Sequence, residues 1–336
     1  MDRLATVRRR VREQRLAGEA LDGAAGVVGF LGAMQAQEYA EAKWSISERA
    51  GGLTDAEVDE AFDRGEILRT HVLRPTWHFV TPADIRWMLT LSAPRVHAGN
   101  RSRYRDLGLD EEVLARSHEL LSEELADGDP RTRRELGTAL AAAGIDTDGQ
   151  LLAHTMMNAE LEQLVPAAGP VGDQALAELT LRFFTSHGPA TVRDFCWWSG
   201  LKVADARAGV EAAGDRLATV DDDGAPWYAA PAPPPDSDTG GAFLIPMYDE
   251  LGVGYRDLRM VLVEQPPRDG LLSRPIVIDG ATVGSWKRAL SPKAVVVEAT
   301  LFTQLDPSEM KRLEAVVARF GEFLELPATL EAEHAA

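Results

Sequence analysis

Cysteine and long apolar runs are both scarce in this chain of 336 residues. Its single cysteine, Cys196, excludes an internal disulfide and a zinc site built from several cysteines. No run of roughly 18 apolar residues occurs, so we expect no membrane-spanning helix. The basic, amphipathic N-terminal stretch is followed by "EALDGAAG" and not by the apolar segment of a signal peptide. The expected location is therefore the cytoplasm.

Motifs that hold nucleotide phosphates or catalytic metals are also missing. The chain has no G-x-x-x-x-G-K-[S/T], no convincing G-x-G-x-x-G and no H-E-x-x-H. His71 and His78 flank a predicted turn, but two histidines without a nearby carboxylate make a poor metal site. Cys196, Trp197 and Trp198 are interpreted as core residues. We therefore expect neither a metal nor a cofactor.

Negative charge dominates the chain except in its N-terminal third. The formal net charge is −18. Residues 1–105 contain 16 Lys and Arg against 14 Asp and Glu, whereas the rest of the chain contains 19 against 39. Arginines cluster before residue 16 and again between residues 67 and 105. The N-terminal third can therefore offer a phosphate-binding face, although a solvated helix surface would have the same composition.

Helical periodicity extends to about residue 215, and it predicts helices at residues 3–17, 24–35 and 38–49. A further helix follows Thr54, which is the predicted N-cap, with Glu57 at the capping-box position and Gly65 as the stop. Residues 67–80 are rich in β-branched and aromatic side chains and predict a hairpin that turns at Arg74-Pro75. Helices followed by a hairpin indicate a winged helix.

An internal repeat indicates several such units. The stretches "GDPRTRREL" (128–136) and "GPATVRDF" (188–195) share the pattern P-x-T-x-R-[D/E]. In each of them an acid, Glu135 or Asp194, follows a capping threonine by three residues, which is the spacing of a capping box. A strand–turn–strand pattern, "LATVDDDGAPWYA", follows the second stretch and resembles another wing.

The last third changes from helical to strand periodicity after a Pro- and Gly-rich linker. Strands are predicted in "AFLIPMY", "MVLVEQ", "RPIVIDG", "ATVGSW" and "AVVVEATLF", with a turn at Asp279-Gly280. Asp306 is then the predicted cap of a helix, and the tail "EAEHAA" is expected to fray. The predicted fold is α+β, with tandem winged helix-turn-helix units at 1–109, 110–173 and 174–230, a linker at 231–241 and a β-rich domain with a terminal helix at 242–336.

Five stretches stand in a characteristic order: "LGAMQAQEYAEAKWSISER", "LRTHVLRPTWHFVTPADIRWML", "GPATVRDFCWWSGL", "LIPMYDELGVGYRD" and "GSWKR". In this order and spacing they resemble the AlkZ-like DNA glycosylases, over about residues 3–325. The resemblance implies tandem winged helices around a DNA-binding concavity. It also implies hydrolysis of the N-glycosidic bond of N7-alkylated purines, including interstrand crosslinks. The family's catalytic motif is Gln-apolar-Gln, which Gln35-Ala36-Gln37 matches.

Glutamine suits this reaction because alkylation at N7 already makes the purine a cationic leaving group. The transition state resembles an oxocarbenium ion, so an amide that positions water and faces the developing charge is sufficient. On a regular helix, side chains two residues apart point about 200° apart. Both glutamines therefore reach one site only if the helix ends near Met34. A plain amide pair that caps a helix end is the alternative interpretation.

The resemblance also places the hairpin close to the site. Arg69 and Arg74 are predicted to contact phosphates, and Thr76 and His78 share one strand face near the glutamines. Trp77 and Phe79 could equally be core residues, with His78 on the surface. Further DNA contacts are predicted from the N-terminal cluster, at Arg8 and Arg12.

The expected partner is double-stranded DNA that carries alkylated purines, bound by a monomer. The stretch "PMYDELGVGYRD" mixes Asp249, Glu250 and Asp257 with aromatic residues, and it fits turn chemistry as readily as a catalytic pair. A non-catalytic winged-helix regulator is the main alternative function. A protein-interaction module that has lost DNA binding is a third, suggested by the net charge.

Overall fold

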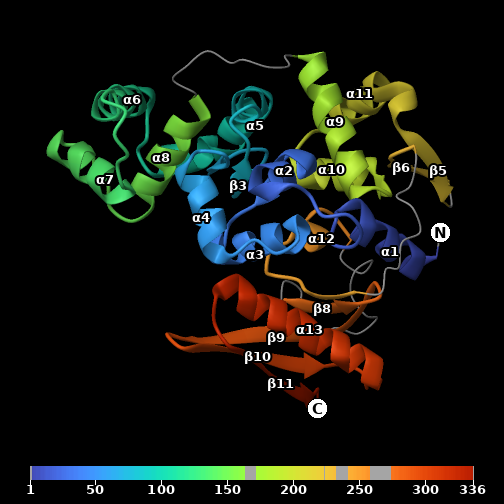
Figure 1. Cartoon of the computed structure of the whole chain (residues 1–336). Coiled ribbons are helices and arrows are strands. Elements are labelled where there is room, and N and C mark those ends of the chain that lie inside the picture. The colour runs from blue at the N-terminus through green and yellow to red at the C-terminus, as the bar shows by residue number, and fades with distance from the viewer. Residues whose placement is uncertain (1, 163–171, 223, 232–240, 258–273, 336) are drawn as a thin grey trace.

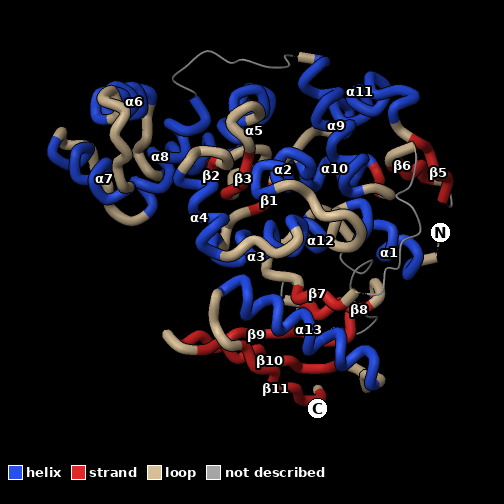
Figure 2. Tube along the Cα trace, in the orientation of Figure 1, coloured by secondary structure: helices blue, strands red, loops and turns tan. Residues whose placement is uncertain are grey.

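The structure is a computed structural model that describes residues 2–162, 172–222, 224–231, 241–257 and 274–335. It is a mixed α+β fold, with 13 α-helices in the described residues and three separate sheets. Figure 1 shows the C-terminal sheet and its helix together as a layer beneath a mostly helical body. Figure 2 shows the three sheets well apart from one another. The predicted α+β class is confirmed.

The first group of elements surrounds a small sheet. Its helices and strands are α2 (Gly23–Leu31), β1 (Met34–Gln35), α3 (Tyr39–Ala50), α4 (Asp55–Asp63), β2 (Leu68–His71) and β3 (Trp77–Val80). The sheet order is β1-β3-β2, and both pairings are antiparallel. The predicted hairpin is confirmed. The capping box of Thr54 and Glu57 at α4 is also confirmed.

The predicted helix 24–35 is wrong at its C-terminal end. Helix α2 stops at Leu31, because Gly32 adopts a φ of 86°, a conformation that L side chains rarely allow. The chain then becomes extended, and Gln35 lies opposite His78 in the β1–β3 pairing. The glutamine segment is therefore strand and loop, not helix.

The middle of the chain is helical. Its elements are α5 (Ile85–Asp106), α6 (Glu111–Glu124), α7 (Arg133–Ala142) and α8 (Gln150–Glu162). The predicted capping box at Thr132 and Glu135 starts α7. Helices α6, α7 and α8 enclose a small core of their own, which contains Leu121, Leu136, Leu140 and Ile145. Figure 1 shows α6 and α7 at one edge of the molecule.

A second group of elements repeats the order of the first. It consists of α9 (Asp173–His187), β4 (Ala190–Thr191), α10 (Val192–Ser199), α11 (Val203–Ala213), the 3-10 turn η1 (Gly214–Arg216), β5 (Ala218–Asp222) and β6 (Ala225–Ala229). The sheet order is β4-β6-β5, again antiparallel. The predicted strand pair and the predicted capping box of Thr191 and Asp194 are both confirmed.

The C-terminal part forms a five-stranded sheet of order β11-β10-β9-β8-β7 with one long helix against it. Its elements are β7 (Ala242–Leu244), α12 (Glu250–Val253), β8 (Pro275–Ile278), β9 (Ala281–Ser291), β10 (Ala294–Leu301), α13 (Pro307–Leu324) and β11 (Ala328–His334). The predicted turn is confirmed, since Asp279 and Gly280 both have positive φ between β8 and β9. Asp306 caps α13 as predicted. The predicted strand "MVLVEQ" lies outside the described residues.

The expectation that the tail "EAEHAA" frays is wrong. Residues 328–334 form β11, which pairs in parallel with β10 from Val295 opposite Ala328 to Leu301 opposite His334. As an edge strand, β11 pairs those of its backbone groups that face β10, and these hydrogen bonds outweigh the entropy that a free terminus would keep.

The N-terminal helix lies against the C-terminal part of the chain. Helix α1 (Arg3–Glu13) ends earlier than the predicted 3–17, and Arg15 after it has a φ of 58°. Its apolar face shares a core with β7, β8 and α12, made of Val7, Val11, Leu16, Phe243, Ile245, Leu251 and Val277. From α3, Trp44 donates to the carbonyl of Leu244 at 2.8 Å and packs on Phe320. The C-terminal layer therefore supports the helices that flank the glutamine segment.

Candidate active site

Both glutamines lie on the outward side of the segment that follows α2. Met34 and Ala36 are buried, whereas Gln35 is half-buried and Gln37 is exposed. This alternation is that of an extended chain, in which residues i and i+2 face the same way. The backbone N–H of Ala36 extends the pairing by donating to the carbonyl of Trp77 at 2.7 Å. Both amides therefore lie outside the core, Gln35 on strand β1 and Gln37 in the bend that follows it.

Two arginines of the hairpin hold this segment. Arg74 donates from Nη2 to Oε1 of Gln35 at 2.9 Å, and because a guanidinium has only donors, the contact fixes which end of the amide is oxygen. Arg69 donates from Nε to the carbonyl of Ala36 at 3.0 Å and from Nη2 to that of Gln37 at 3.4 Å. Its guanidinium also lies 4.5 Å from the centre of the Trp77 ring. Both predicted DNA-contacting arginines therefore touch the glutamine segment directly.

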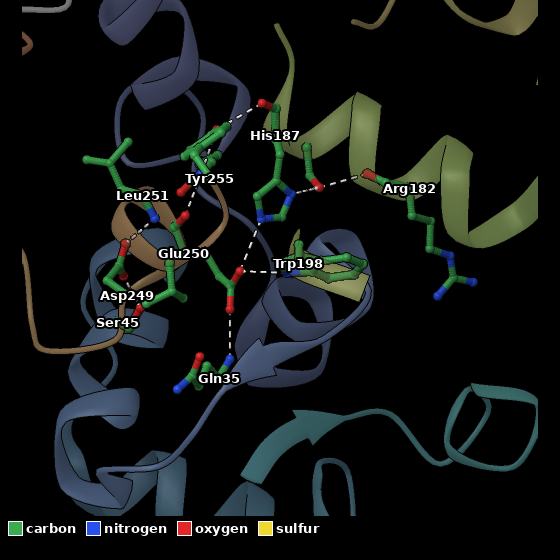
Figure 3. Close-up of polar contacts among 12 residues, drawn as sticks. Gln35, Ser45, Arg182, His187, Trp198, Asp249, Glu250, Leu251 and Tyr255 are labelled. Carbon is green, nitrogen blue, oxygen red and sulfur yellow. Dashed lines mark hydrogen bonds and ion pairs between the residues drawn. The ribbon is translucent and has the colours of Figure 1, made fainter. Parts of the chain in front are cut away.

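A buried carboxylate anchors the segment from the inside. Glu250 is 1% exposed, and its Oε1 accepts the backbone N–H of Gln35 at 2.7 Å (Figure 3). Its Oε2 accepts the indole N–H of Trp198 at 2.8 Å and lies 3.2 Å from Nε2 of His187. Burial acts to raise the pKa of Glu250, but His187 and these hydrogen bonds outweigh it and lower that pKa. The carboxylate is therefore ionised directly behind Gln35.

The residue before it fixes the start of α12. Asp249 is fully buried and forms a two-point ion pair with Arg49, with Nη1–Oδ2 at 2.8 Å and Nη2–Oδ1 at 3.0 Å. It also accepts from the hydroxyl of Ser45 and from the backbone N–H of Leu251. Burial acts to raise the pKa of Asp249, but the charge of Arg49 outweighs this and lowers it. The ion pair ties α12 to α3 and sets the position of Glu250.

Sequence reasoning left the role of Asp249 and Glu250 open, and it did not connect either of them with the glutamines. Asp249 bonds with Ser45, which lies 204 positions away in the chain. Glu250 bonds with Gln35, which lies 215 positions away. The available signal was two adjacent acids inside the otherwise apolar stretch "LIPMYDELGV". Charged residues are rarely buried unless they are paired, so such a stretch indicates partners elsewhere in the chain.

His78 and Thr76 lie beside Gln35, and His78 is not on the surface. The imidazole is fully buried, and its Nδ1 donates to the carbonyl of Thr76 at 2.8 Å. Burial, together with the charge of Arg74, lowers the pKa of His78 to about 4. The histidine is therefore neutral near pH 7, with a lone pair on Nε2.

Three buried polar atoms of this cluster find no hydrogen-bond partner within the described part of the chain: His78 Nε2, Thr76 Oγ1 and Arg74 Nε. Unpaired buried polar atoms are uncommon, because each costs the desolvation of its group. Their concentration next to Gln35 indicates a place where water or a ligand completes the hydrogen bonding.

The other predicted residues lie elsewhere or play a different part. Arg8 is half-buried on α1 and donates to the carbonyl of Asp279 at 2.8 Å, so it contacts the C-terminal layer. Arg12 is also half-buried on α1. Their role as DNA contacts stays a prediction. His71 lies opposite Trp77 and binds Glu160 at 2.9 Å, so it does not meet His78 across the hairpin.

The prediction that both tryptophans are core residues is half wrong. Trp198 is fully buried, as predicted, but Trp197 is 50% exposed, with its ring 6.0 Å from the guanidinium of Arg74. Neighbouring residues on a helix point about 100° apart, so α10 presents only one of the two to the core. The exposed Trp197 ring is thus placed next to the arginine that holds Gln35.

The described residues include neither a group of metal ligands nor a membrane-spanning helix. They contain no cluster of three or more histidine, cysteine or acidic side chains arranged to hold a metal ion. Within the same residues, each helix is either too short or too polar to cross a bilayer.

Comparisons with known proteins give one family and one solved structure of similar fold. A family model described as DNA glycosylase AlkZ-like matches residues 28–323. Among solved structures, the Streptomyces sahachiroi DNA glycosylase AlkZ is similar over 98% of this chain and 99% of its own, with a TM-score of 0.73 and 22% sequence identity. At that identity the likeness shows a shared fold. A search of curated proteins gave no match.

Proposed function

Because this chain belongs to the AlkZ-like family of DNA glycosylases, we propose that it excises cationic N7-alkylated purines from double-stranded DNA. The bond that is hydrolysed is the N-glycosidic bond, in isolated lesions and in interstrand crosslinks. Gln35 and Gln37 position the attacking water. The observation that supports this proposal is that neither amide is buried, while Arg74 holds the Gln35 side chain and Arg69 and Glu250 hold the backbone of the segment.

The chemistry assigns a different part to each amide. Arg74 occupies one lone pair of the Gln35 oxygen, which leaves the other lone pair and the NH₂ group. The Gln35 amide is therefore fixed in orientation, which suits a group that must hold the attacking water in line with the N-glycosidic bond. Gln37 is exposed and is held only through its backbone carbonyl, so its side chain can turn to the sugar or to the water. An alkylated purine leaves without a general acid, because it already carries positive charge.

The electrostatics around the pair favour a transition state with positive charge on the sugar. The ionised Glu250 lies directly behind Gln35, where its field stabilises a developing oxocarbenium ion. His78 lies opposite Gln35 but is neutral, so it adds no opposing positive charge. Arg74 is positively charged, but the negative charge of the nearby Glu250 partly offsets the charge of Arg74.

The fold assignment belongs to the same proposal. The order helix, strand, helix, helix, hairpin in α2–β3 and again in α9–β6 is that of a winged helix, and it supports units at 1–109 and 174–230. The sequence predicts a second winged helix-turn-helix unit at residues 110–173. Their described part contains helices and no wing strands, so we keep the helix-turn-helix assignment without a wing and assign residues 242–336 to the β-rich domain. A monomer that acts in the cytoplasm completes the proposal.

The decisive experiment measures base release from duplex DNA that carries N7-methylguanine. Wild-type protein is expected to release free base and to leave alkali-labile abasic sites. Gln35→Ala and Gln37→Ala should each lower the rate about 100-fold or more, by analogy with the loss of a single oxyanion-hole donor. Gln304→Ala, an exposed glutamine in the loop after β10, is the matched control and should release base at the wild-type rate.

Two results would remove the proposal. Undiminished release by both glutamine variants would exclude the amides from the mechanism. Tight binding to one palindromic sequence without any base release would favour the regulator alternative instead.

A further inference from the structure

A polar cavity lies away from the glutamines, between α1, the start of α10 and strand β6. Its volume is about 500 Å³, and three arginines line it: Arg10, Arg193 and Arg256. Thr191 and Trp227 complete its wall, and Asp194 and Asp257 also face it. Arginines outnumber carboxylates, so the cavity favours an anion.

Arg10 is the buried member of this set. Its side chain is 1% exposed, its Nε donates to the carbonyl of Pro189 at 3.0 Å, and its guanidinium lies 3.6 Å from the centre of the Tyr255 ring. The ring of Trp227 is 5.5 Å away. Nη1 of Arg10 is buried and has no hydrogen-bond partner among the described residues. A charged donor left unpaired inside a protein is costly, so its position in the wall of a cavity indicates a missing acceptor.

The hydrogen bonds of Asp194 set part of the cavity wall. Asp194 accepts with Oδ2 from the backbone and the hydroxyl of Thr191, at 2.9 and 2.8 Å, and with Oδ1 from the backbone N–H of Arg256 at 3.0 Å. These bonds set the start of α10 and place the loop that carries Arg256. The carboxylate therefore shapes the cavity, whereas the exposed side chains of Arg193 and Arg256 remain at its mouth.

We propose that this cavity binds a phosphate group. A phosphate oxygen matches the vacant donor of Arg10, and guanidinium groups bind phosphate with parallel hydrogen bonds. The half-buried Trp227 offers an aromatic wall beside the arginines, which suits the phosphate of a nucleotide unit. Such a phosphate comes either from the backbone of bound DNA or from a free nucleotide or inorganic phosphate.

This site is separate from the glutamine site. Glu250, His187 and Tyr255 form a buried row between them, in which Tyr255 donates to the carbonyl of His187 at 2.8 Å (Figure 3). Gln35 lies at the Glu250 end of the row, and Arg10 stacks on Tyr255 at the other end. Phosphate binding here can therefore be measured without reference to base release.

The test uses a double variant, Arg193→Ala with Arg256→Ala, because both side chains are exposed and their removal leaves the buried Arg10 in place. Arg207→Ala, an exposed arginine on α11, is the matched control. Calorimetric titration with inorganic phosphate and with a deoxynucleoside monophosphate, at constant ionic strength, should show saturable binding to wild type and to the control. The double variant should bind at least about tenfold more weakly, as expected for lost charge-assisted hydrogen bonds.

A second measurement identifies the source of the phosphate. The affinity for undamaged duplex DNA is measured against salt concentration. The slope of the logarithm of this affinity against the logarithm of the salt concentration counts the phosphates that are contacted. A slope smaller by about 2 in the double variant, one for each lost cation, assigns the cavity to backbone phosphates. An unchanged slope together with weakened phosphate binding assigns it to a free phosphate compound. The proposal is overturned if wild type and double variant bind the phosphate probes alike and share one salt slope.

Discussion

The sheets of the first and the second group of elements are built alike, yet only the first group carries the glutamines. Elements α2 to β3 and elements α9 to β6 follow the same order, and their sheets pair in the same way, as β1-β3-β2 and β4-β6-β5. The two groups differ where the first strand meets the next helix. In the second group, Thr191 ends β4 and is also the N-cap of α10, so the strand runs directly into the helix.

In the first group, three residues separate strand from helix. Ala36, Gln37 and Glu38 follow β1, and the N-cap Glu38 makes no side-chain capping bond to α3. The helix start is thus less well capped, and the segment before it is held by Arg69, Arg74 and Glu250 instead. A short loop on a rigid scaffold is a common place for function, and here it converts a structural unit into a candidate catalytic one.

The hairpins of the two groups also differ in charge. The first contains Arg69 and Arg74, whereas the second contains three consecutive acids in "VDDDG". Its two arginines give the first hairpin the charge that attracts a phosphate backbone. The comparison therefore predicts that DNA recognition and chemistry both concentrate on the first group.

The largest expected effect comes from the carboxylate that joins the two groups. Glu250 binds Gln35 of the first and His187 and Trp198 of the second. Glu250→Gln should lower the free energy of unfolding by about 3 kcal/mol, because it leaves a buried partner unpaired. Urea denaturation measures this, and Glu298→Gln, an exposed acid on β10, is the control. A variant as stable as wild type would show that the groups are held together by packing alone.

A pH effect should belong to the first group. The pKa of His78 is lowered to about 4, so between pH 7 and pH 5 the unfolded chain takes up a proton that the folded protein does not. The contribution of the neutral His78 to the free energy of unfolding is therefore complete above the ordinary histidine pKa. It is lost as the pH falls, and the loss reaches about 2 kcal/mol at pH 5. At the corresponding positions of the second group, β6 has Trp227 and Tyr228 opposite β4, and neither is a histidine.

The measurement is the difference between wild type and His78→Gln in free energy of unfolding, at pH 7 and at pH 5. The difference is needed because Glu48, whose pKa burial and Asp249 raise to about 8, changes stability in the opposite direction over this range. Equal pH dependence in the two proteins would mean that His78 is not held neutral.

The contrast between the hairpins predicts a moderate effect on DNA binding. Arg69→Ala should weaken binding to all duplexes about tenfold at moderate salt and lower the salt slope by about 1. Arg64→Ala, an exposed arginine that pairs with Glu60 and Glu66 at the end of α4, should leave both unchanged. A loss confined to one DNA sequence would contradict a role in phosphate contact.

The smallest effect concerns the helix starts themselves. Thr191→Ala should destabilise the protein by about 1 kcal/mol, since it removes a capping box from a partly buried helix start. Thr54→Ala should cost less, because its capping box at α4 is exposed. Thermal unfolding of the two variants gives the order, and the reverse order would contradict the greater dependence of the second group on capping.

Local features of the fold were predictable, and long-range ones were not. Thr54, Thr132 and Thr191 were recognised as caps because the acid that completes each box lies only three residues away. The hairpins followed from strand periodicity and turn residues. The tail was missed because β11 gains its stability from β10, a partner that no nearby residue reveals.

The candidate site divides in the same way. Gln35 and Gln37 were identified from a short motif and the order of the motifs around it. The end of α2 was misplaced, since "VVGFLGAM" is apolar throughout and only the φ of Gly32 breaks the helix. The part played by Glu250 depends on contacts across 215 residues, and such pairings leave no periodic trace in a sequence.

The position of Glu250 in the chain has a consequence for synthesis. A ribosome makes the chain from its N-terminus, so both glutamines and the arginines that hold them emerge long before residue 250 does. Until then the backbone of Gln35 has no acceptor, and α1 and Trp44 have no C-terminal layer to rest on. A nascent or truncated chain therefore carries the whole glutamine motif and still lacks the floor of its site, so competence for chemistry arrives only with the last quarter of translation.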